Sequence, residues 1–99
     1  MILSIIKVVG HSLHPTYEDG DFVLVSKLPI FFGGIQVGDT IVFRHPTLGK
    51  LIKIVERVED EGRQFFVIGL DPLSRDSRTF GAVARTLVLG KVIGHIRKR

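Results

Sequence analysis

Short apolar runs rich in β-branched residues alternate with turn residues along the chain, and no window keeps a helical spacing of apolar positions over three turns. The runs expected to form strands are residues 2–9, 22–25, 40–44, 51–58, 64–68, 87–89 and 92–96. Gly62 marks a hairpin loop between the fourth and fifth runs, and Gly90 predicts a break between the last two. Many short strands without a repeat or linker predict one all-β domain over residues 1–99, folded as a small coiled barrel or a bent sheet.

The segment Leu28–Ile35 departs from this pattern, because it places large apolar residues between a proline and two glycines. That composition is not typical of a regular strand. Two roles are open for it. The segment covers one end of the core, which is the better fit to its composition, or it projects as an apolar lip toward substrate or lipid.

With 99 residues the chain has room for one core, and its lack of cysteine excludes disulfides and thiolate metal sites. Its net charge of +4 owes much to Arg97-Lys98-Arg99. A basic terminus can contact phosphates or an anionic bilayer, although a solvated terminus is the simpler interpretation. No aromatic or glycine-rich nucleic-acid motif accompanies it, so we expect no nucleic-acid partner.

No segment reaches the ~20 apolar residues that a membrane span needs. The opening apolar run is ended by Lys7 and lacks the features of a secretory signal. As given, the chain is expected to be soluble and cytoplasmic, and it would be membrane-associated if an N-terminal anchor were missing. Peripheral membrane contact would then use Leu28–Ile35 or the basic C-terminus.

Ser12 and Lys53 are the two candidate catalytic residues. Ser12 lies in a loop punctuated by Gly10 and Pro15, and a serine nucleophile needs a base to take its proton. Free lysine is neutral at pH 7 only about once in 2,500 molecules, but burial favours the neutral amine. Lys53 lies inside an apolar run, where such burial is possible. Each has a structural alternative: Ser12 as a turn former, and Lys53 as an edge-strand lysine with its ammonium in water.

A second polar cluster comprises Ser74, Asp76 and Arg78. Its alternating charges predict a salt bridge that fixes a loop, and a solvated turn is the alternative. If this loop approaches Lys53, the Ser74 hydroxyl can orient the neutral amine.

The histidines are poor candidates for a metal site. His11 and His14 are three residues apart, His45 and His95 lie elsewhere, and no acidic or cysteine side chains are grouped with them. We therefore expect neither a metal nor another cofactor, and we place His11 and His14 at the edge of a cleft.

Four segments, in this order between Val8 and Val92, resemble conserved boxes of the signal peptidase I family. They are the nucleophile box (residues 10–16 and 20–27), the next strand (37–43), the position of the general base (Lys53) and the closing box (69–78 and 80–83). The resemblance implies a single catalytic domain with the coiled all-β fold of signal peptidases and LexA-type peptidases. It also implies a Ser/Lys endopeptidase that removes an N-terminal presequence from a precursor protein.

The resemblance also implies roles for individual residues. They are Ser12 as nucleophile, Lys53 as base, Ser74, Asp76, Arg78 and Gly10 as catalytic support, and Leu13, His14 and Pro15 as contacts to the substrate. The chain departs from the family pattern in the closing box, where Leu70-Asp71 replaces a Gly-Asp-Asn sequence. Gly10 also lacks the hydroxyl that some members use for the oxyanion, so stabilisation rests on backbone donors such as the Ser12 N–H.

Within the family, the chain resembles a short subgroup, the maturation proteases of nickel-type superoxide dismutase, in its size and in residues 44–46 and 74–78. This favours a small processing protease over a general signal peptidase. Two alternatives stay open. One is a LexA-type self-cleaving domain, although no DNA-binding helices precede the first predicted strand. The other is an inactive relative that binds peptides or anionic surfaces.

Overall fold

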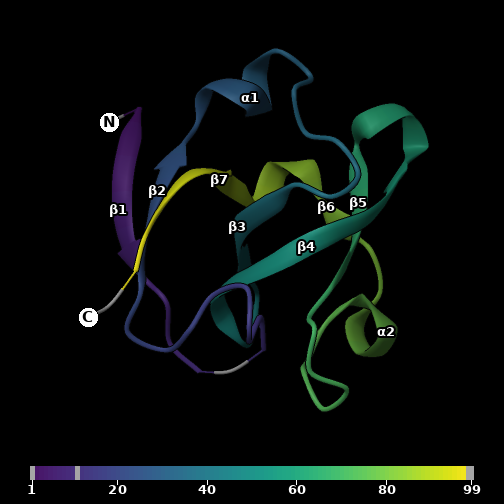
Figure 1. Ribbon diagram of the computed structural model, residues 1–99. Coiled ribbons are helices and arrows are strands. Elements are labelled where there is room, and N and C mark those ends of the chain that lie inside the picture. The colour runs from purple at the N-terminus through teal and green to yellow at the C-terminus, as the bar shows by residue number, and fades with distance from the viewer. Residues whose placement is uncertain (1, 11, 98–99) are drawn as a thin grey trace.

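The computed structural model describes residues 2–10 and 12–97, and within them the chain forms one seven-stranded antiparallel sheet (Figure 1). The strands are β1 (Leu3–Lys7), β2 (Phe22–Ser26), β3 (Thr40–His45), β4 (Gly49–Glu59), β5 (Gln64–Ile68), β6 (Val83–Ala84) and β7 (Val88–Ile96). Their order across the sheet is β1-β2-β7-β3-β4-β5-β6, so that β1 and β6 form the two edges. The all-β prediction is confirmed, and of the two expected forms the chain adopts the open, bent sheet rather than a closed barrel.

Two apolar clusters pack against the central strands. Because side chains alternate along a strand, Ile41 and Phe43 of β3 enter one cluster while Val42 enters the other. β4 is likewise covered on both sides, since Leu51 packs on the first cluster and Ile52 on the second. The buried members of the first cluster are Ile35, Ile41, Phe43, Val55, Phe65, Val67, Val83 and Val88, and those of the second are Val8, Val23, Val25 and Val42.

The C-terminal strand corrects one prediction, because β7 runs through Gly90 without a break. A Cβ at Gly90 would touch Val25 and would lie 2.8 Å from the carbonyl oxygen of Ser26. Glycine is required here because β2 passes so close, not because the strand ends. The register of β7 shifts on each side of Gly90, once opposite β2 and once opposite β3. These bulges bend the strand so that it pairs with both neighbours.

Two single-turn helices, α1 (Leu28–Phe31) and α2 (Ser77–Phe80), are absent from the sequence prediction. Four residues are too few to leave a periodic pattern of apolar positions. α2 is started by its cap instead, since the carboxylate of Asp76 accepts a hydrogen bond from the Arg78 backbone N–H at 3.0 Å. Neither helix is long and apolar enough to span a bilayer, and none in the described part of the chain is.

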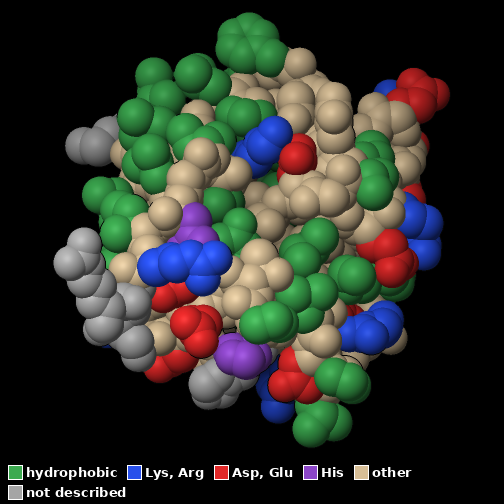
Figure 2. Space-filling model, viewed as in Figure 1, with side chains coloured by type: hydrophobic (Ala, Val, Ile, Leu, Met, Phe, Trp, Pro, Cys, Tyr) green, Lys and Arg blue, Asp and Glu red, His purple; other side chains and the backbone are tan. Residues whose placement is uncertain are grey.

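The segment from α1 to Ile35 combines the two roles that the sequence left open. Ile35 is buried in the first cluster and Ile30 packs against it, so the segment covers the core. Phe31 and Phe32 instead project outward and are 69% and 81% exposed. Figure 2 shows hydrophobic side chains gathered on this side of the molecule, above and beside β1. Contact of this surface with lipid stays a prediction.

Candidate active site

The loop that carries Ser12 joins β1 to β2 and is fastened at its base and near its tip. At the base, the Val8 N–H donates to the carbonyl oxygen of Asp21 at 2.7 Å. Nearer the tip, the Gly10 N–H donates to Oδ1 of Asp19 at 2.8 Å. Gly10 has a φ of +89°, a backbone conformation that favours glycine. The loop therefore holds Ser12 on a defined backbone path.

A buried carboxylate ties this loop to the far end of the chain. Asp21 is fully buried, and its Oδ2 accepts from the Glu18 N–H at 3.0 Å and lies 2.7 Å from Nε2 of His95. The His95 ring also contacts Tyr17, with ring centroids 4.7 Å apart. Sequence reasoning missed this contact, because turn composition marks the turn at Asp21 but gives no sign of a partner 74 positions away.

Lys53 lies in the middle of β4, which is paired to β3 on one side and β5 on the other. Its side chain is only 4% exposed, so the alternative of an edge-strand lysine with its ammonium in water is wrong. Burial lowers the pKa of the Lys53 amine below its ordinary value. The charges of Asp76 and Asp71 act to raise this pKa, whereas that of Arg78 lowers it further. The net shift is downward, so the neutral amine forms more easily at Lys53 than in a free lysine.

Ser12 and Lys53 line the same cavity, which has a volume of about 280 Å³ and lies between β1, the Ser12 loop and β4. The other lining residues are Ile6, Lys7, Val8, Val9, Leu13, Lys50, Leu51 and Ile52. No hydrogen bond joins Ser12 Oγ or Ser74 Oγ to the Lys53 amine among the described residues. Every fully enclosed side-chain polar atom of these residues has a partner. The unpartnered amine must therefore retain access to the cavity.

The predicted cluster of Ser74, Asp76 and Arg78 is a connected network. The guanidinium of Arg78 donates to both carboxylate oxygens of Asp76, with Nη2 at 2.6 Å from Oδ2 and Nε at 3.0 Å from Oδ1. Oδ2 also accepts from the Gly69 N–H at 2.8 Å. The Ser74 hydroxyl lies 3.3 Å from the same oxygen and 2.8 Å from the carbonyl oxygen of Asp71. The predicted salt bridge is confirmed, and the solvated-turn alternative is wrong because Asp76 is fully buried.

The charge of Asp76 is firmly held. Burial alone acts to raise the pKa of its carboxyl, but hydrogen bonds from Arg78 and from the Gly69 N–H outweigh burial, so the pKa lies well below its usual range. The same contact raises the pKa of Arg78. Both members of the pair therefore stay ionised. Their charges have opposite effects on the pKa of Lys53, since Asp76 raises it and Arg78 lowers it.

This network reaches the nucleophile loop through the backbone. The carbonyl oxygen of Ser12 accepts hydrogen bonds from the N–H groups of Leu70 and Asp71, the latter at 3.2 Å. Gly69 makes this approach possible, since a Cβ there would lie 2.9 Å from the same oxygen and 2.8 Å from Cβ of Ser74. Sequence reasoning placed Gly69 in the closing box but did not foresee that it is the point of contact. A glycine directly after a buried apolar strand was the available signal.

The other predicted substrate contacts are divided between two hollows. Leu13 is buried and lines the cavity with Ser12. His14 instead lines a separate surface hollow together with Leu70, Asp71 and Pro72. Pro15 is exposed beside it and follows a cis peptide bond. His11, like Lys98 and Arg99 of the basic C-terminus, lies outside the described residues.

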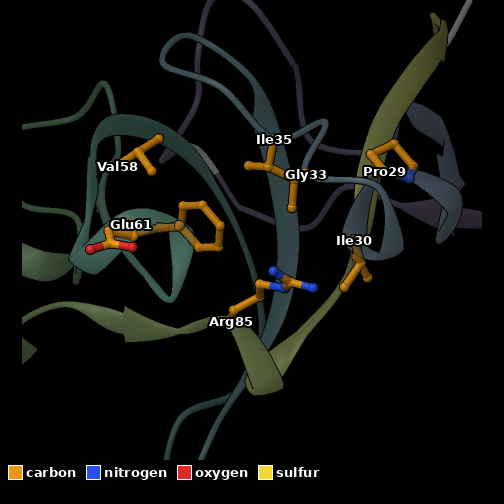
Figure 3. A pocket seen from close by; sticks show the side chains of 9 residues that line it. Pro29, Ile30, Gly33, Ile35, Val58, Glu61 and Arg85 are labelled. Atoms are coloured by element: carbon orange, nitrogen blue, oxygen red, sulfur yellow. The ribbon is translucent and has the colours of Figure 1, made fainter.

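Other features of the described residues are less suited to chemistry. A second cavity of about 300 Å³ lies near α1 and the turn between β4 and β5. It is lined largely by apolar side chains; the Arg85 guanidinium points inward below Gly33 and Ile35, and Glu61 lies to one side (Figure 3). It holds no serine or lysine. No group of three or more potential metal-ligating side chains occurs in residues 2–10 and 12–97.

An all-β domain in which a loop serine shares a cavity with a buried lysine has the composition of a peptidase site without a histidine or a metal. The family model described as signal peptidase, peptidase S26, matches residues 1–60. This match covers more than half of the chain, and the protein belongs to this family of peptidases. A search of curated proteins found no match. The matched region contains Ser12 and Lys53 and ends before the segment with Ser74.

Proposed function

We propose that the protein is a serine endopeptidase in which Ser12 is the nucleophile and Lys53 the general base. The observation that carries this proposal is the burial of Lys53 in the cavity that Ser12 also lines. A neutral amine is the form that can take a proton, and burial lowers the pKa of Lys53 in that direction. Family membership supports the reaction class, because it makes a peptidase the expected activity.

In the proposed reaction, Ser12 Oγ attacks the carbonyl carbon of the scissile peptide while its proton passes to the Lys53 amine. The resulting ammonium then gives this proton to the leaving amine, and water releases the acyl group by the same route. No hydrogen bond joins Nζ to Oγ among the described residues, so the two atoms must come closer for this transfer. Catalytic hydrogen bonds are often incomplete before substrate binds, so this requirement is consistent with the role.

The neighbouring groups have supporting roles in this proposal. The Ser74 hydroxyl donates its hydrogen within its own loop, which leaves an oxygen lone pair to accept from the lysine amine and orient it. The developing oxyanion is assigned to the backbone N–H of Ser12. The Gly10 N–H is already donated to Asp19, so Gly10 serves the shape of the loop rather than the oxyanion.

The proposed substrate is the N-terminal presequence of a precursor protein, bound in an extended conformation along the cavity. The resemblance of residues 44–46 and 74–78 to nickel-type superoxide dismutase maturation proteases makes that precursor the first one to test. A peptide spanning its processing site should be cut at one bond, as mass spectrometry of the products would show.

Turnover of an internally quenched presequence peptide tests the proposal. Ser12→Ala and Lys53→Ala should each abolish turnover, since they remove the nucleophile and the base. Ser4→Ala and Lys27→Ala are matched controls, because both residues are exposed and lie outside the cavity. Turnover that survives either cavity substitution, in protein shown to be folded by circular dichroism, would reject the Ser/Lys mechanism. A wild-type protein that binds but does not cut would instead identify an inactive peptide-binding relative.

A further inference from the structure

Two cationic side chains stand at the cavity that holds Ser12 and Lys53. Lys7, at the end of β1, and Lys50, near the start of β4, both line this cavity and are exposed. No acidic side chain lines it, and the other lining residues except Ser12 and Lys53 are apolar. The cavity therefore has a positive rim around an apolar interior.

The two lysines have no anionic partner in the described part of the chain. Other surface cations do: Arg57 lies 3.1 Å from carboxylate oxygens of Glu56 and Glu59, and Lys91 lies 3.1 Å from Asp39. No salt bridge of the described residues includes Lys7 or Lys50. An anion that entered the cavity would find these two charges uncompensated.

The charged side chains that act on the pKa of Lys53 lie on a different segment of the chain from Lys7 and Lys50. The charges that shift the pKa of Lys53 are those of Asp76, Arg78 and Asp71, and neither cavity lysine is among them. Lys7 and Lys50 are exposed at the rim of the cavity, so they are placed to meet a side chain that enters it.

We propose that this cavity selects peptides carrying a glutamate or aspartate side chain near the scissile bond, with Lys7 and Lys50 holding the carboxylate. This inference rests on the proposed peptidase function and adds a substrate class to it. Because alternate side chains of an extended peptide face the same side, the preference applies to one position, or to two positions separated by one residue. The apolar interior accepts the neighbouring aliphatic side chain on that face.

The test uses a peptide that the wild-type enzyme cuts, amidated at its C-terminus so that an introduced glutamate carries its only carboxylate. Glutamate, glutamine and lysine are placed in turn at each position around the cut. At the favoured position, glutamate should raise kcat/KM over glutamine by about 2- to 5-fold, the size expected for an exposed ion pair. Lysine at the same position should lower kcat/KM relative to glutamine. The gain with glutamate and the loss with lysine should both shrink in 0.5 M salt, because exposed charges are screened.

Lys7→Gln with Lys50→Gln should bring the glutamate-to-glutamine ratio close to one. Lys27→Gln removes one positive charge at an exposed lysine outside the cavity and should leave the ratio as it is. A ratio near one in the wild type, a ratio that survives the double substitution, or an equal loss in Lys27→Gln would overturn the inference.

Binding separates this inference from the peptidase proposal. Labelled glutamate and glutamine peptides are titrated into the Ser12→Ala variant, and fluorescence anisotropy gives both dissociation constants. If wild type cuts no peptide but the variant still prefers glutamate in a way that depends on Lys7 and Lys50, the peptidase proposal fails and the charge selection stands. If wild type cuts peptides without any charge preference, the charge selection fails and the peptidase proposal stands.

Discussion

Replacement of Gly69 by alanine should damage the site far more than it damages the fold. Gly69 directly follows strand β5, and its N–H donates to Asp76 at 2.8 Å. An added Cβ would meet the side chain of Ser74 and would lie 2.9 Å from the carbonyl oxygen of Ser12. The substitution therefore inserts one methyl group where the proposed nucleophile loop meets the closing segment.

The size of the effect follows from these distances. Ordinary contact between a carbon and its neighbours begins near 3.5 Å, so the Ser12 and Ser74 segments must each move by roughly 0.5 Å or more. A misplacement approaching 1 Å can cost about 100-fold in rate, which gives an expected loss in kcat/KM of about 10- to 100-fold. The cost to the free energy of unfolding is that of an overpacked site, about 1–3 kcal/mol.

Peptide turnover and urea unfolding measured on the same samples check this expectation. Gly94→Ala in β7 is the matched control, because its Cβ would lie 3.3 Å from Cβ of Leu24 and within 4 Å of no residue that lines the cavity. That contact is tight, but alanine is also favoured over glycine in a strand by about 0.5–1 kcal/mol, so the two effects nearly cancel. A folded Gly69→Ala protein with full activity would refute the reasoning that this junction positions Ser12.

Three further predictions concern charge and packing. Arg78→Gln removes a positive charge that lowers the pKa of Lys53, and it leaves the negative charge of Asp76 unpaired. Both effects raise the pKa of Lys53, so the rising limb of kcat/KM against pH should move to higher pH. A limb that does not move would contradict this. The pKa of Asp76 is lower in the folded protein than in the unfolded chain, so ionised Asp76 stabilises the fold. This stabilisation is complete above the ordinary carboxyl pKa and is lost as the pH falls toward the lowered pKa of the folded state. Thermal melts should therefore show a steeper loss of stability between about pH 5 and pH 2 in wild type than in Asp76→Asn. Gly90→Ala forces a Cβ against Val25 and should lower the free energy of unfolding by about 1–3 kcal/mol in urea titrations, with an m-value close to wild type.

What the sequence predicted correctly depends on local patterns. Alternating apolar residues predicted the main strands, since strand periodicity depends only on residues a few positions apart. The apolar neighbours of Lys53 made its burial possible but did not decide between burial and a place on an edge strand. The break expected at Gly90 is wrong because a glycine can mark either a strand end or the close passage of another backbone. Only the position of β2 decides between them. The contact between Asp21 and His95 was missed for the same reason, since it depends on which strands pair and not on local composition.

The segment with Asp76 and Arg78 shows why such a small domain keeps an ion pair, buried at Asp76 and half exposed at Arg78, near its proposed base. A lone carboxylate at Asp76 would favour the charged form of the Lys53 amine and so work against general-base catalysis. Pairing with Arg78 offsets this effect, since the guanidinium adds a charge that lowers the lysine pKa. Asp76 can then organise Gly69 and Ser74 around the nucleophile loop while Lys53 keeps a lowered pKa. The closing segment thus influences the base through its balance of charge, without a hydrogen bond to the lysine among the described residues.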